Sequence, residues 1–414
     1  MNYVNDMKIL HVTYSGIGGA GIAARRSHEA LTAAGVQSHL LCARNAPPGC
    51  DVADKRWLRK CWHAINYHYE KWRRRKLLAE DQILRSANIL PGYLLKQIMS
   101  YDPDIVHLHW INSGTLSVSE IQRIPVPVVW TLHDMWPLTG SSHCAGSLLG
   151  KWRQAGMPSA FSEIDETGYC RKLEALHDQK MAGKPDGIIS PSRWMHGQVG
   201  KKRFSKNKHV QWIPNCLDLE VFCPAHDQAL AKKKLGLPTD KKVLLFVSSW
   251  GSSPVKGYDL IELALAALSD DIRQTCVIAI LGRQRSSNEG HGFPVIYLGN
   301  REGDKALAEV YQAADVFLCP SREDNYPNTV MEASACGLPT VAFETGGLPD
   351  LVESGWSGML AEPFDPRSFA ECMGAALRDS DRMGKNALEK ATQVNNPSRH
   401  AQSLARFYKA VLSE

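Results

Sequence analysis

Four polar residues of the 414-residue sequence, His133, Lys256, Asp324 and Glu332, have the type and spacing to bind a charged, hydroxyl-rich substrate. The first three follow apolar stretches typical of β-strands, and Glu332 lies eight residues beyond Asp324. In an open parallel sheet, ligands bind outside the carboxyl ends of the strands. Carboxylates there can hold hydroxyl groups, a lysine can neutralise a phosphate, and a histidine can hydrogen-bond a hydroxyl or steady developing charge.

The segment from Asp324 to Glu332 spans a loop and the start of a short helix, which Gly337 and Pro339 end. The first N–H groups of a helix lack intrahelical partners, so those near Asn328 and Thr329 could meet a phosphate. A second interpretation stays open. Thr329-x-x-Glu332 has the form of a capping box, in which Glu332 only closes the helix.

Lys256 and His133 can each be interpreted as a ligand-binding residue or as an ordinary structural one. Lys256 adjoins Gly257 and a Gly/Ser-containing loop that includes Ser249, which favours a diphosphate contact. The alternative is a solvated lysine. His133 stands at a strand end, and the neighbouring Asp134 and Trp136 support a contact with substrate. The alternative is a structural histidine whose hydrogen bonds are satisfied within the protein. His107 and His109 face one side of a strand without carboxylate or cysteine partners, so we interpret them as structural.

Residues 16–21 match the pattern G-x-G-x-x-G after the first expected strand. A nicotinamide cofactor would require an acidic residue at the end of the second strand. That strand ends Cys42-Ala43-Arg44-Asn45, so a glycine loop facing a ligand, or a tight turn, is favoured instead.

Two series of strand and helix patterns position these residues and predict an α/β protein with two doubly wound parallel sheets. The expected strands are 8–14, 38–42, 105–109, 128–132, 187–190 and 210–213, then 242–248, 276–281, 295–298, 316–319 and 340–343. We expect an N-terminal domain over 1–222, joined by a C-terminal helix (398–414), and a second domain over 223–397.

Composition excludes several classes of protein. Hydrophobic residues are 44% and charged residues 22%, as in globular proteins, and no apolar run is long enough to span a bilayer. The N-terminus does not resemble a secretory signal, and the 11 cysteines form no C-x-x-C pair. A reducing cytoplasm fits best, and no metal site is expected.

Residues 55–76, the basic segment, hold nine Lys/Arg and one acidic residue, interleaved with aromatic residues. An interfacial helix on anionic lipid has this composition, and so does a charged surface helix. A nucleic-acid surface is disfavoured because no such module is present. The residues we assign to membrane or acceptor contact are Arg56, Trp57, Arg59, Trp62, Trp72, Arg73, Arg74 and Arg75.

Several motifs in order along the whole chain resemble glycosyltransferase family 4. They are Gly18-Gly19-Ala20-Gly21, the segments 130–136, 190–192 and 213–218, Lys256-Gly257, the stretch from Asp324 to Glu332, and the segment 345–349. Two of these segments look most like the bacterial polysaccharide branch, similar to colanic-acid-type enzymes. The resemblance implies the GT-B fold, with two facing Rossmann-like domains, and a retaining, metal-independent transfer from a nucleotide sugar without a cofactor.

The resemblance also implies roles for individual residues. Glu332 stands at the ribose-binding glutamate, Asp324 at the first acid of the E-x7-E motif, Lys256 at the diphosphate lysine and His133 at the catalytic histidine. Gly18 and Gly19 belong to the loop over the phosphates, and Arg301 follows the strand near the base. The donor-binding set also includes Ser249, Asn325, Asn328 and Thr329.

Two departures from the family pattern concern the donor site. Asp324 replaces a more frequent glutamate, and the arginine common before the lysine is absent from 248–255. Arg283 is a candidate replacement. We expect a polysaccharide glycosyltransferase with a glycan or lipid-linked acceptor at the inner face of the cytoplasmic membrane. A nucleotide-sugar epimerase and a catalytically silent nucleotide-sugar-binding scaffold are the alternatives.

Overall fold

The computed structural model describes residues 7–53, 61–62, 64–69, 72, 84–144, 168–248, 254–282 and 293–413. These residues form two compact units. The first holds the described residues up to Cys216 together with those from Pro397 onward, and the second holds Leu217–Asn396. The predicted two-domain organisation is confirmed.

The first unit is built on a seven-stranded parallel sheet in the order β3-β2-β1-β4-β5-β6-β7. Its strands are β1 (Lys8–Ser15), β2 (Gln37–Arg44), β3 (Asp51–Val52), β4 (Ile105–Leu108), β5 (Val128–Thr131), β6 (Gly187–Ser190) and β7 (His209–Trp212). Its helices are α1 (Gly19–Ala33), α3 (Leu95–Met99), α4 (Val118–Ile121), α5 (Trp136–Thr139), α7 (Gly168–Met181), α8 (Arg193–Gly200), the 3-10 turn η1 (Arg203–Asn207) and α17 (Pro397–Leu412).

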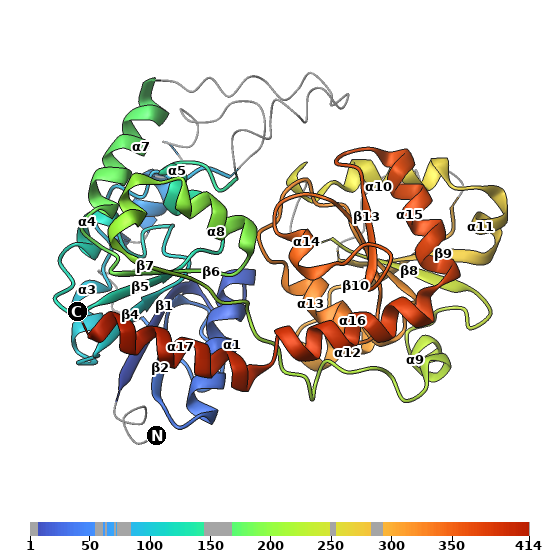
Figure 1. The fold of residues 1–414 in the computed structure, drawn as a ribbon, viewed down its shortest axis with the longest axis horizontal. Coiled ribbons are helices and arrows are strands. Elements are labelled where there is room, and N and C mark those ends of the chain that lie inside the picture. The colour runs from blue at the N-terminus through green and yellow to red at the C-terminus, as the bar shows by residue number, and fades with distance from the viewer. Residues whose placement is uncertain are drawn as a thin grey trace. The chain divides into compact units, whose positions relative to one another are not determined.

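Helix α17 lies beside α1, as Figure 1 shows, although more than 360 residues separate the two helices along the chain. Phe407 and Tyr408 of α17 are buried in one core with Ile9, Ile105 and Val129 from the starts of three strands. The expectation that the C-terminal helix packs on the N-terminal domain is therefore confirmed.

The second unit is built on a six-stranded parallel sheet in the order β10-β9-β8-β11-β12-β13. Its strands are β8 (Lys242–Ser248), β9 (Cys276–Gly282), β10 (Val295–Gly299), β11 (Val316–Cys319), β12 (Thr340–Phe343) and β13 (Gly358–Ala361). Its helical elements are α9 (Gln228–Lys234), the turn η2 (Pro254–Lys256), α10 (Tyr258–Ala267), α11 (Asp270–Thr275), α12 (Asp304–Gln312), α13 (Asn328–Ala335), α14 (Leu348–Leu351), α15 (Pro366–Arg378) and α16 (Ser380–Val394).

The strand order of each sheet reverses direction once. The reversal falls between β1 and β4 in the first sheet and between β8 and β11 in the second. Ligands of open α/β sheets bind at such switch points, outside the carboxyl ends of the strands. The residues that follow these strands are therefore candidates for ligand binding and catalysis.

The boundary between the units lies after Cys216 rather than after residue 222, which corrects the predicted limit. The physical reason is packing. Leu217 and Phe222 are buried in the core of the second unit, where the Phe222 ring lies 6.4 Å from that of Tyr311. Gln312 also donates a hydrogen bond to the carbonyl of Cys223 at 2.8 Å.

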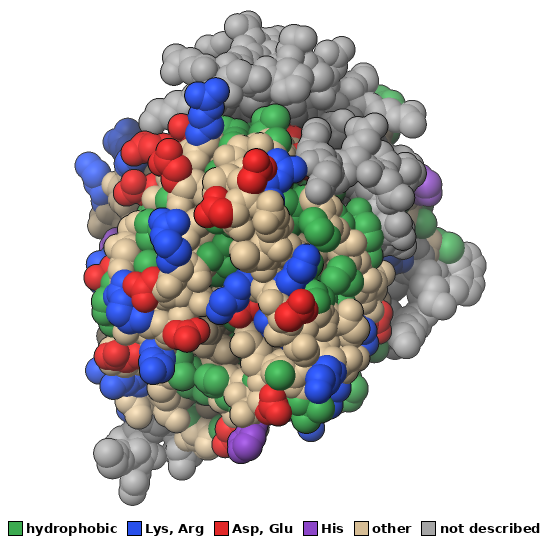
Figure 2. Space-filling model, turned by 90° about the vertical axis from the view of Figure 1, so that its right-hand side faces the viewer, with side chains coloured by type: hydrophobic (Ala, Val, Ile, Leu, Met, Phe, Trp, Pro, Cys, Tyr) green, Lys and Arg blue, Asp and Glu red, His purple; other side chains and the backbone are tan. Residues whose placement is uncertain are grey.

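Acidic and basic side chains are interspersed on the face shown in Figure 2, so the described part of that face carries no patch of a single charge sign. Across the described helices, none has both the length and the apolar character required to cross a bilayer.

Candidate functional sites at the two strand edges

The glycine loop between β1 and α1 contains two kinds of glycine. A Cβ at Gly16 would lie 2.4 Å from the Pro47 ring, and one at Gly21 would lie 1.7 Å from the carbonyl oxygen of Ser15. These two glycines are required by packing. Gly18 and Gly19 are exposed, a Cβ at Gly18 would meet nothing within 4 Å, and Gly18 supplies no side-chain cap to α1. The pattern therefore combines a structural turn with an open backbone at the helix start.

His133 follows β5 and contacts a second histidine. Its Nε2 lies 2.9 Å from Nδ1 of His109, and Nε2 of His109 lies 2.9 Å from Nδ1 of His11. His11 and His109 are fully buried, whereas His133 is half-buried at the end of the series. Burial lowers the pKa of His133 to about 4, against the opposing effect of Asp134. His133 is consequently an uncharged imidazole at neutral pH.

The structure gives different surroundings to His107 and His109, which we interpreted together as structural. His107 is held by the hydroxyl groups of Tyr408 and Thr131, each 2.7 Å away, which fits a structural role. His109 instead contacts His133 directly. Nitrogen atoms of His11, His107 and His109 also lie within 4.8 Å of one another, so these three residues are the candidate metal ligands found among the described residues.

Sequence reasoning missed His11. It lies inside an apolar strand stretch, and its partner His109 is 98 residues away along the chain. A usable signal was present, because His11 and His107 occupy paired positions of neighbouring strands. That pairing becomes visible only once the strand order and register are known.

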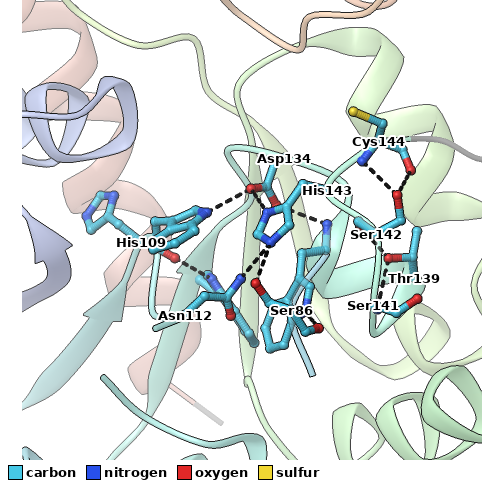
Figure 3. Close-up of polar contacts among 12 residues, drawn as sticks. Ser86, His109, Asn112, Asp134, Thr139, Ser141, Ser142, His143 and Cys144 are labelled. Carbon is cyan, nitrogen blue, oxygen red and sulfur yellow. Dashed lines mark hydrogen bonds and ion pairs between the residues drawn. The ribbon is translucent and has the colours of Figure 1, made fainter. Parts of the chain in front are cut away.

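Asp134, which follows His133 directly in the chain, contacts His143, as Figure 3 shows. Its carboxylate accepts hydrogen bonds from Trp110 Nε1 at 2.9 Å and the Trp136 backbone N–H at 3.0 Å, and it lies 2.6 Å from His143 Nδ1. The other nitrogen of His143 lies 3.0 Å from Ser86 Oγ. Burial would raise the pKa of Asp134, but His143 and the hydrogen bonds outweigh it, so this pKa is lowered. Ser86 is fully buried, so the series anchors the loop.

In the second unit, Lys256 and Asp324 meet at the switch point. Lys256 Nζ lies 2.6 Å from Asp324 Oδ2, and the lysine side chain is 44% exposed. The order Lys-Gly has a steric reason. Gly257 has a φ of +66°, and a Cβ there would lie 2.0 Å from the carbonyl oxygen of Pro320. Arg322 secures the same turn, since it forms an ion pair with Asp259 and donates to the Pro254 carbonyl.

The loop that carries Asp324 is also held on its other side, by the adjacent glycines Gly346 and Gly347. The N–H of Gly347 donates to the Asp324 carbonyl at 2.9 Å. Gly346 has a φ of +56°, and a Cβ there would lie 2.3 Å from the same oxygen. The backbone on both sides of the Lys256–Asp324 pair is therefore tightly determined.

Glu332 does not form the capping box. Helix α13 begins at Asn328 after Pro327 and has no side-chain cap, which places Thr329 inside the helix rather than at its cap. The buried Glu332 carboxylate instead accepts a hydrogen bond from Tyr311 OH at 3.0 Å. The capping-box interpretation is wrong, because the Glu332 carboxylate is hydrogen-bonded to a hydroxyl group of the neighbouring helix α12 and not to the start of its own helix. Asn325 is buried, and Asn328 and Thr329 are half-buried in the first turn of α13.

Several predicted residues lie outside the described part of the chain. They are Ser249, Arg283, Arg56, Trp57, Arg59, Arg73, Arg74 and Arg75. Arg301 is exposed after β10. Within the basic segment, Trp62 Nε1 donates to the Pro91 carbonyl at 2.9 Å, whereas Trp72 is exposed. Part of the predicted aromatic surface is thus engaged with the protein itself.

Two family models match the chain in succession. "Glycosyltransferase Family 4" matches residues 17–221, and "Glycosyl transferases group 1" matches residues 241–379. The first match covers most of the first unit and extends just past its boundary, the second match lies in the second unit, and together they span most of the chain.

Similar proteins support the same conclusion on the fold. A D-inositol 3-phosphate glycosyltransferase of Thermobispora bispora is 26% identical over 361 residues, which cover 82% of this chain and 76% of that protein. The sucrose-phosphate synthase of Thermosynechococcus elongatus superposes with a TM-score of 0.68 at 19% identity, over 98% of this chain and 99% of that one. HepE of Anabaena in complex with UDP-glucose gives 0.67 at 16% identity, over 98% and 100%. The predicted GT-B fold is confirmed.

Proposed function

We propose that the chain transfers a sugar from a nucleotide-diphosphate sugar, with retention and without a metal ion, because models of family 4 and group 1 glycosyltransferases match most of it. The observation that carries this proposal is the arrangement at the second switch point. An exposed ammonium group there faces a carboxylate, and the buried Glu332, eight residues beyond that carboxylate in the chain, accepts a hydrogen bond from a tyrosine. The similarity to HepE, whose structure is a complex with UDP-glucose, supports a nucleotide-sugar donor.

Lys256 and the start of α13 would bind the diphosphate. The departing diphosphate gains negative charge as its bond to the sugar breaks, and a fixed ammonium group stabilises that charge more in the transition state than in the ground state. The N-terminus of α13 adds a partial positive charge at Thr329. Glu332 would accept hydrogen bonds from ribose hydroxyls, and the bond from Tyr311 would orient its carboxylate.

Retention follows if the reaction occurs on one face of the sugar. The bond between the anomeric carbon and the phosphate oxygen breaks while the acceptor oxygen bonds to the same carbon. The acceptor proton passes to the leaving phosphate oxygen. Asp324 is paired with Lys256, so its assigned role here is to hold that lysine rather than to act as nucleophile.

The acceptor in this proposal is a glycan or lipid-linked oligosaccharide of cell-surface polysaccharide synthesis. A second candidate acceptor, an inositol phosphate, is favoured by the similarity to the D-inositol 3-phosphate glycosyltransferase of Thermobispora bispora. A transfer assay with EDTA present, using UDP- and GDP-sugars with each acceptor class, tests the proposal. Sugar transfer to one class supports it. Donor turnover without acceptor indicates an epimerase, and nucleotide binding without turnover indicates a scaffold.

The same proposal places the protein at the inner face of the cytoplasmic membrane through the basic segment. Each Lys or Arg near an anionic surface contributes about 1 kcal/mol of attraction. Reversal of the charges at Arg73, Arg74 and Arg75 should weaken sedimentation with phosphatidylglycerol vesicles while leaving phosphatidylcholine controls unchanged. Equal sedimentation of the unsubstituted protein and the charge-reversed variant with phosphatidylglycerol vesicles would contradict the membrane contact.

A further inference from the structure

One face of the first sheet changes from apolar to polar along its strands. Near the strand starts it carries Ile9, Ile105 and Val129, which pack against α1 and α17. Two residues further along β1 and β4, the same face carries His11 and His107, and His109 follows. The opposite face holds Leu10, Val12, Leu108 and Trp130 and remains apolar. The polar stripe ends at His133.

His11, His109 and His133 form a continuous series of hydrogen bonds, with both N···N distances at 2.9 Å. Burial lowers the pKa of His11 and of His109 well below the usual value, so each ring is neutral and carries one N–H and one lone pair. The series therefore has two possible directions. Either His11 donates to His109 and His109 donates to His133, or every bond runs the opposite way.

The far end of the series selects the direction. His11 Nε2 is fully buried and has no hydrogen-bond partner among the described residues. If the bonds ran from His133 toward His11, that nitrogen would be a buried N–H without an acceptor, which folded proteins rarely contain. If they run from His11 toward His133, the same atom is a bare lone pair, which is tolerated more often.

We propose that His11 and His109 are positioning residues that fix His133 as its Nδ1–H tautomer. Nε2 of His133 then accepts from His109, and Nδ1–H is left to donate. The tautomer of an imidazole is set by the hydrogen bond that its other nitrogen makes. In this state His133 is a neutral hydrogen-bond donor and has no lone pair at Nδ1 with which to act as a base.

The chemical consequence rests on the proposed glycosyl transfer, in which His133 contacts substrate. A neutral N–H donor suits an oxygen of a sugar hydroxyl or phosphate and does not remove its proton. Removing the acceptor proton is then left to the leaving phosphate, as the retaining reaction requires. The tautomer itself does not depend on that function.

The contacts favour the hydrogen-bonded series over a metal site. Both nitrogens of His107 are taken by hydroxyl groups, and both nitrogens of His109 are taken by histidines. A metal would need three lone pairs directed at one point, at about 2.0–2.1 Å for zinc. Each of these rings offers a single lone pair, and those of His107 and His109 are already engaged.

Two-bond proton–nitrogen NMR spectra of the full chain with ¹⁵N-labelled histidine test the tautomer directly, in EDTA and without any substrate. His133→Gln identifies the His133 signals. We expect a protonated Nδ1 and a bare Nε2 at His133. His109→Phe should abolish this preference, and His109→Asn, whose amide can still donate to His133, should restore it. His107→Phe is the matched control, because His107 is equally buried on the same strand face but does not touch His133.

A protonated Nε2 at His133 in the unsubstituted protein would overturn the proposal. So would an unchanged tautomer in His109→Phe. If that variant does not fold, His11→Phe removes the far end of the series, and an unaltered His133 tautomer there would also contradict the proposal. Joint displacement of the His11, His107 and His109 signals by one equivalent of zinc, added after the EDTA has been removed, would show a metal site instead. Failure to bind any nucleotide sugar would refute the proposed function while leaving these results standing.

Discussion

The two units share a sheet topology but differ in what their strands present at the switch point. In the first unit the ends of β1, β4 and β5 lead to a buried series of uncharged imidazoles that reaches half-buried His133. In the second unit the central strand β8 is apolar on both faces, with Val243 and Leu245 on one and Leu244 and Phe246 on the other. The charged groups at its switch point come after the strands, as the Lys256–Asp324 ion pair.

This difference shows that the topology supplies the position and the strand-terminal residues supply the chemistry. A neutral donor such as His133 suits hydroxyl groups and costs little to bury. A formal charge such as Lys256 suits a diphosphate and has to remain near water or a counter-ion. In the proposed transfer, His133 would therefore suit a hydroxyl group and Lys256 the diphosphate.

The largest expected difference between the units is their response to acid. His11, His107 and His109 are buried and neutral, and burial lowers the pKa of His133 and His400 to about 4. Their unfolded pKa is about 6.5, so their stabilising effect is complete above that pH and is lost as pH falls toward 4. Each such histidine removes about 1.4 kcal/mol of unfolding free energy per pH unit in this window.

Hydrogen exchange measured by mass spectrometry at pH 7.5 and pH 5 checks this difference unit by unit. Peptides from the first unit should lose protection, after correction for the intrinsic exchange rate. The described part of the second unit holds no buried histidine and serves as the internal control. Equal loss of protection in both units would contradict the account.

Replacing Lys256 tests the charged site. Lys256→Ala should reduce kcat by about 10²–10³, because a donor aimed at developing negative charge contributes about 2.7–4 kcal/mol. Lys305→Ala, which removes an exposed lysine of α12 in the same unit, is the matched control and should leave the rate unchanged. Steady-state kinetics with the active donor measures both. A reduction of only a few-fold for Lys256→Ala would remove the lysine from the mechanism.

Two glycines of the first unit sharpen the distinction between packing and ligand access. Gly21→Ala places a Cβ against the Ser15 carbonyl and should lower the unfolding free energy by about 1–3 kcal/mol. Gly18→Ala meets open space, has an extended φ of −88°, and should change stability by at most about 0.5 kcal/mol. Urea unfolding of both variants decides the matter. Similar losses would show that the whole glycine loop is structural.

The smallest expected effect concerns the hydrogen bond to Glu332. Tyr311→Phe should weaken nucleotide binding by about 0.5–1.5 kcal/mol, because the carboxylate loses the donor that orients it. Tyr326→Phe is the matched control, since Tyr326 is equally buried but bonds to Asn395. Calorimetric titration compares them. Equal weakening in both variants would mean that only core packing is affected.

Strands were the easiest elements to predict from sequence. The ranges 187–190, 242–248, 316–319 and 340–343 coincide with β6, β8, β11 and β12, because each is a compact apolar stretch bounded by turn residues. β3 was missed because it has two residues, Asp51 and Val52. β13 was missed because Gly358-Met359-Leu360-Ala361 contains no β-branched residue.

The candidate site was predictable only where a residue follows a strand end or belongs to a short motif. Lys256, Asp324 and Glu332 follow recognisable strand ends. The partners that orient them do not. Tyr311 precedes Glu332 by 21 residues, and His11 precedes His109 by 98. Such contacts depend on strand order and helix packing, and a capping pattern around Thr329 suggested a different local role for Glu332.

The most direct test of the central claim is a thermal-shift measurement with EDTA present. UDP, GDP and their sugars are compared on the unsubstituted protein, on Glu332→Ala and on Glu332→Gln. Our account predicts stabilisation by one nucleotide series, lost in Glu332→Ala and reduced in Glu332→Gln, since the buried carboxylate is assigned to the ribose. Failure of every nucleotide to stabilise the unsubstituted protein, or full stabilisation of Glu332→Ala, would contradict it.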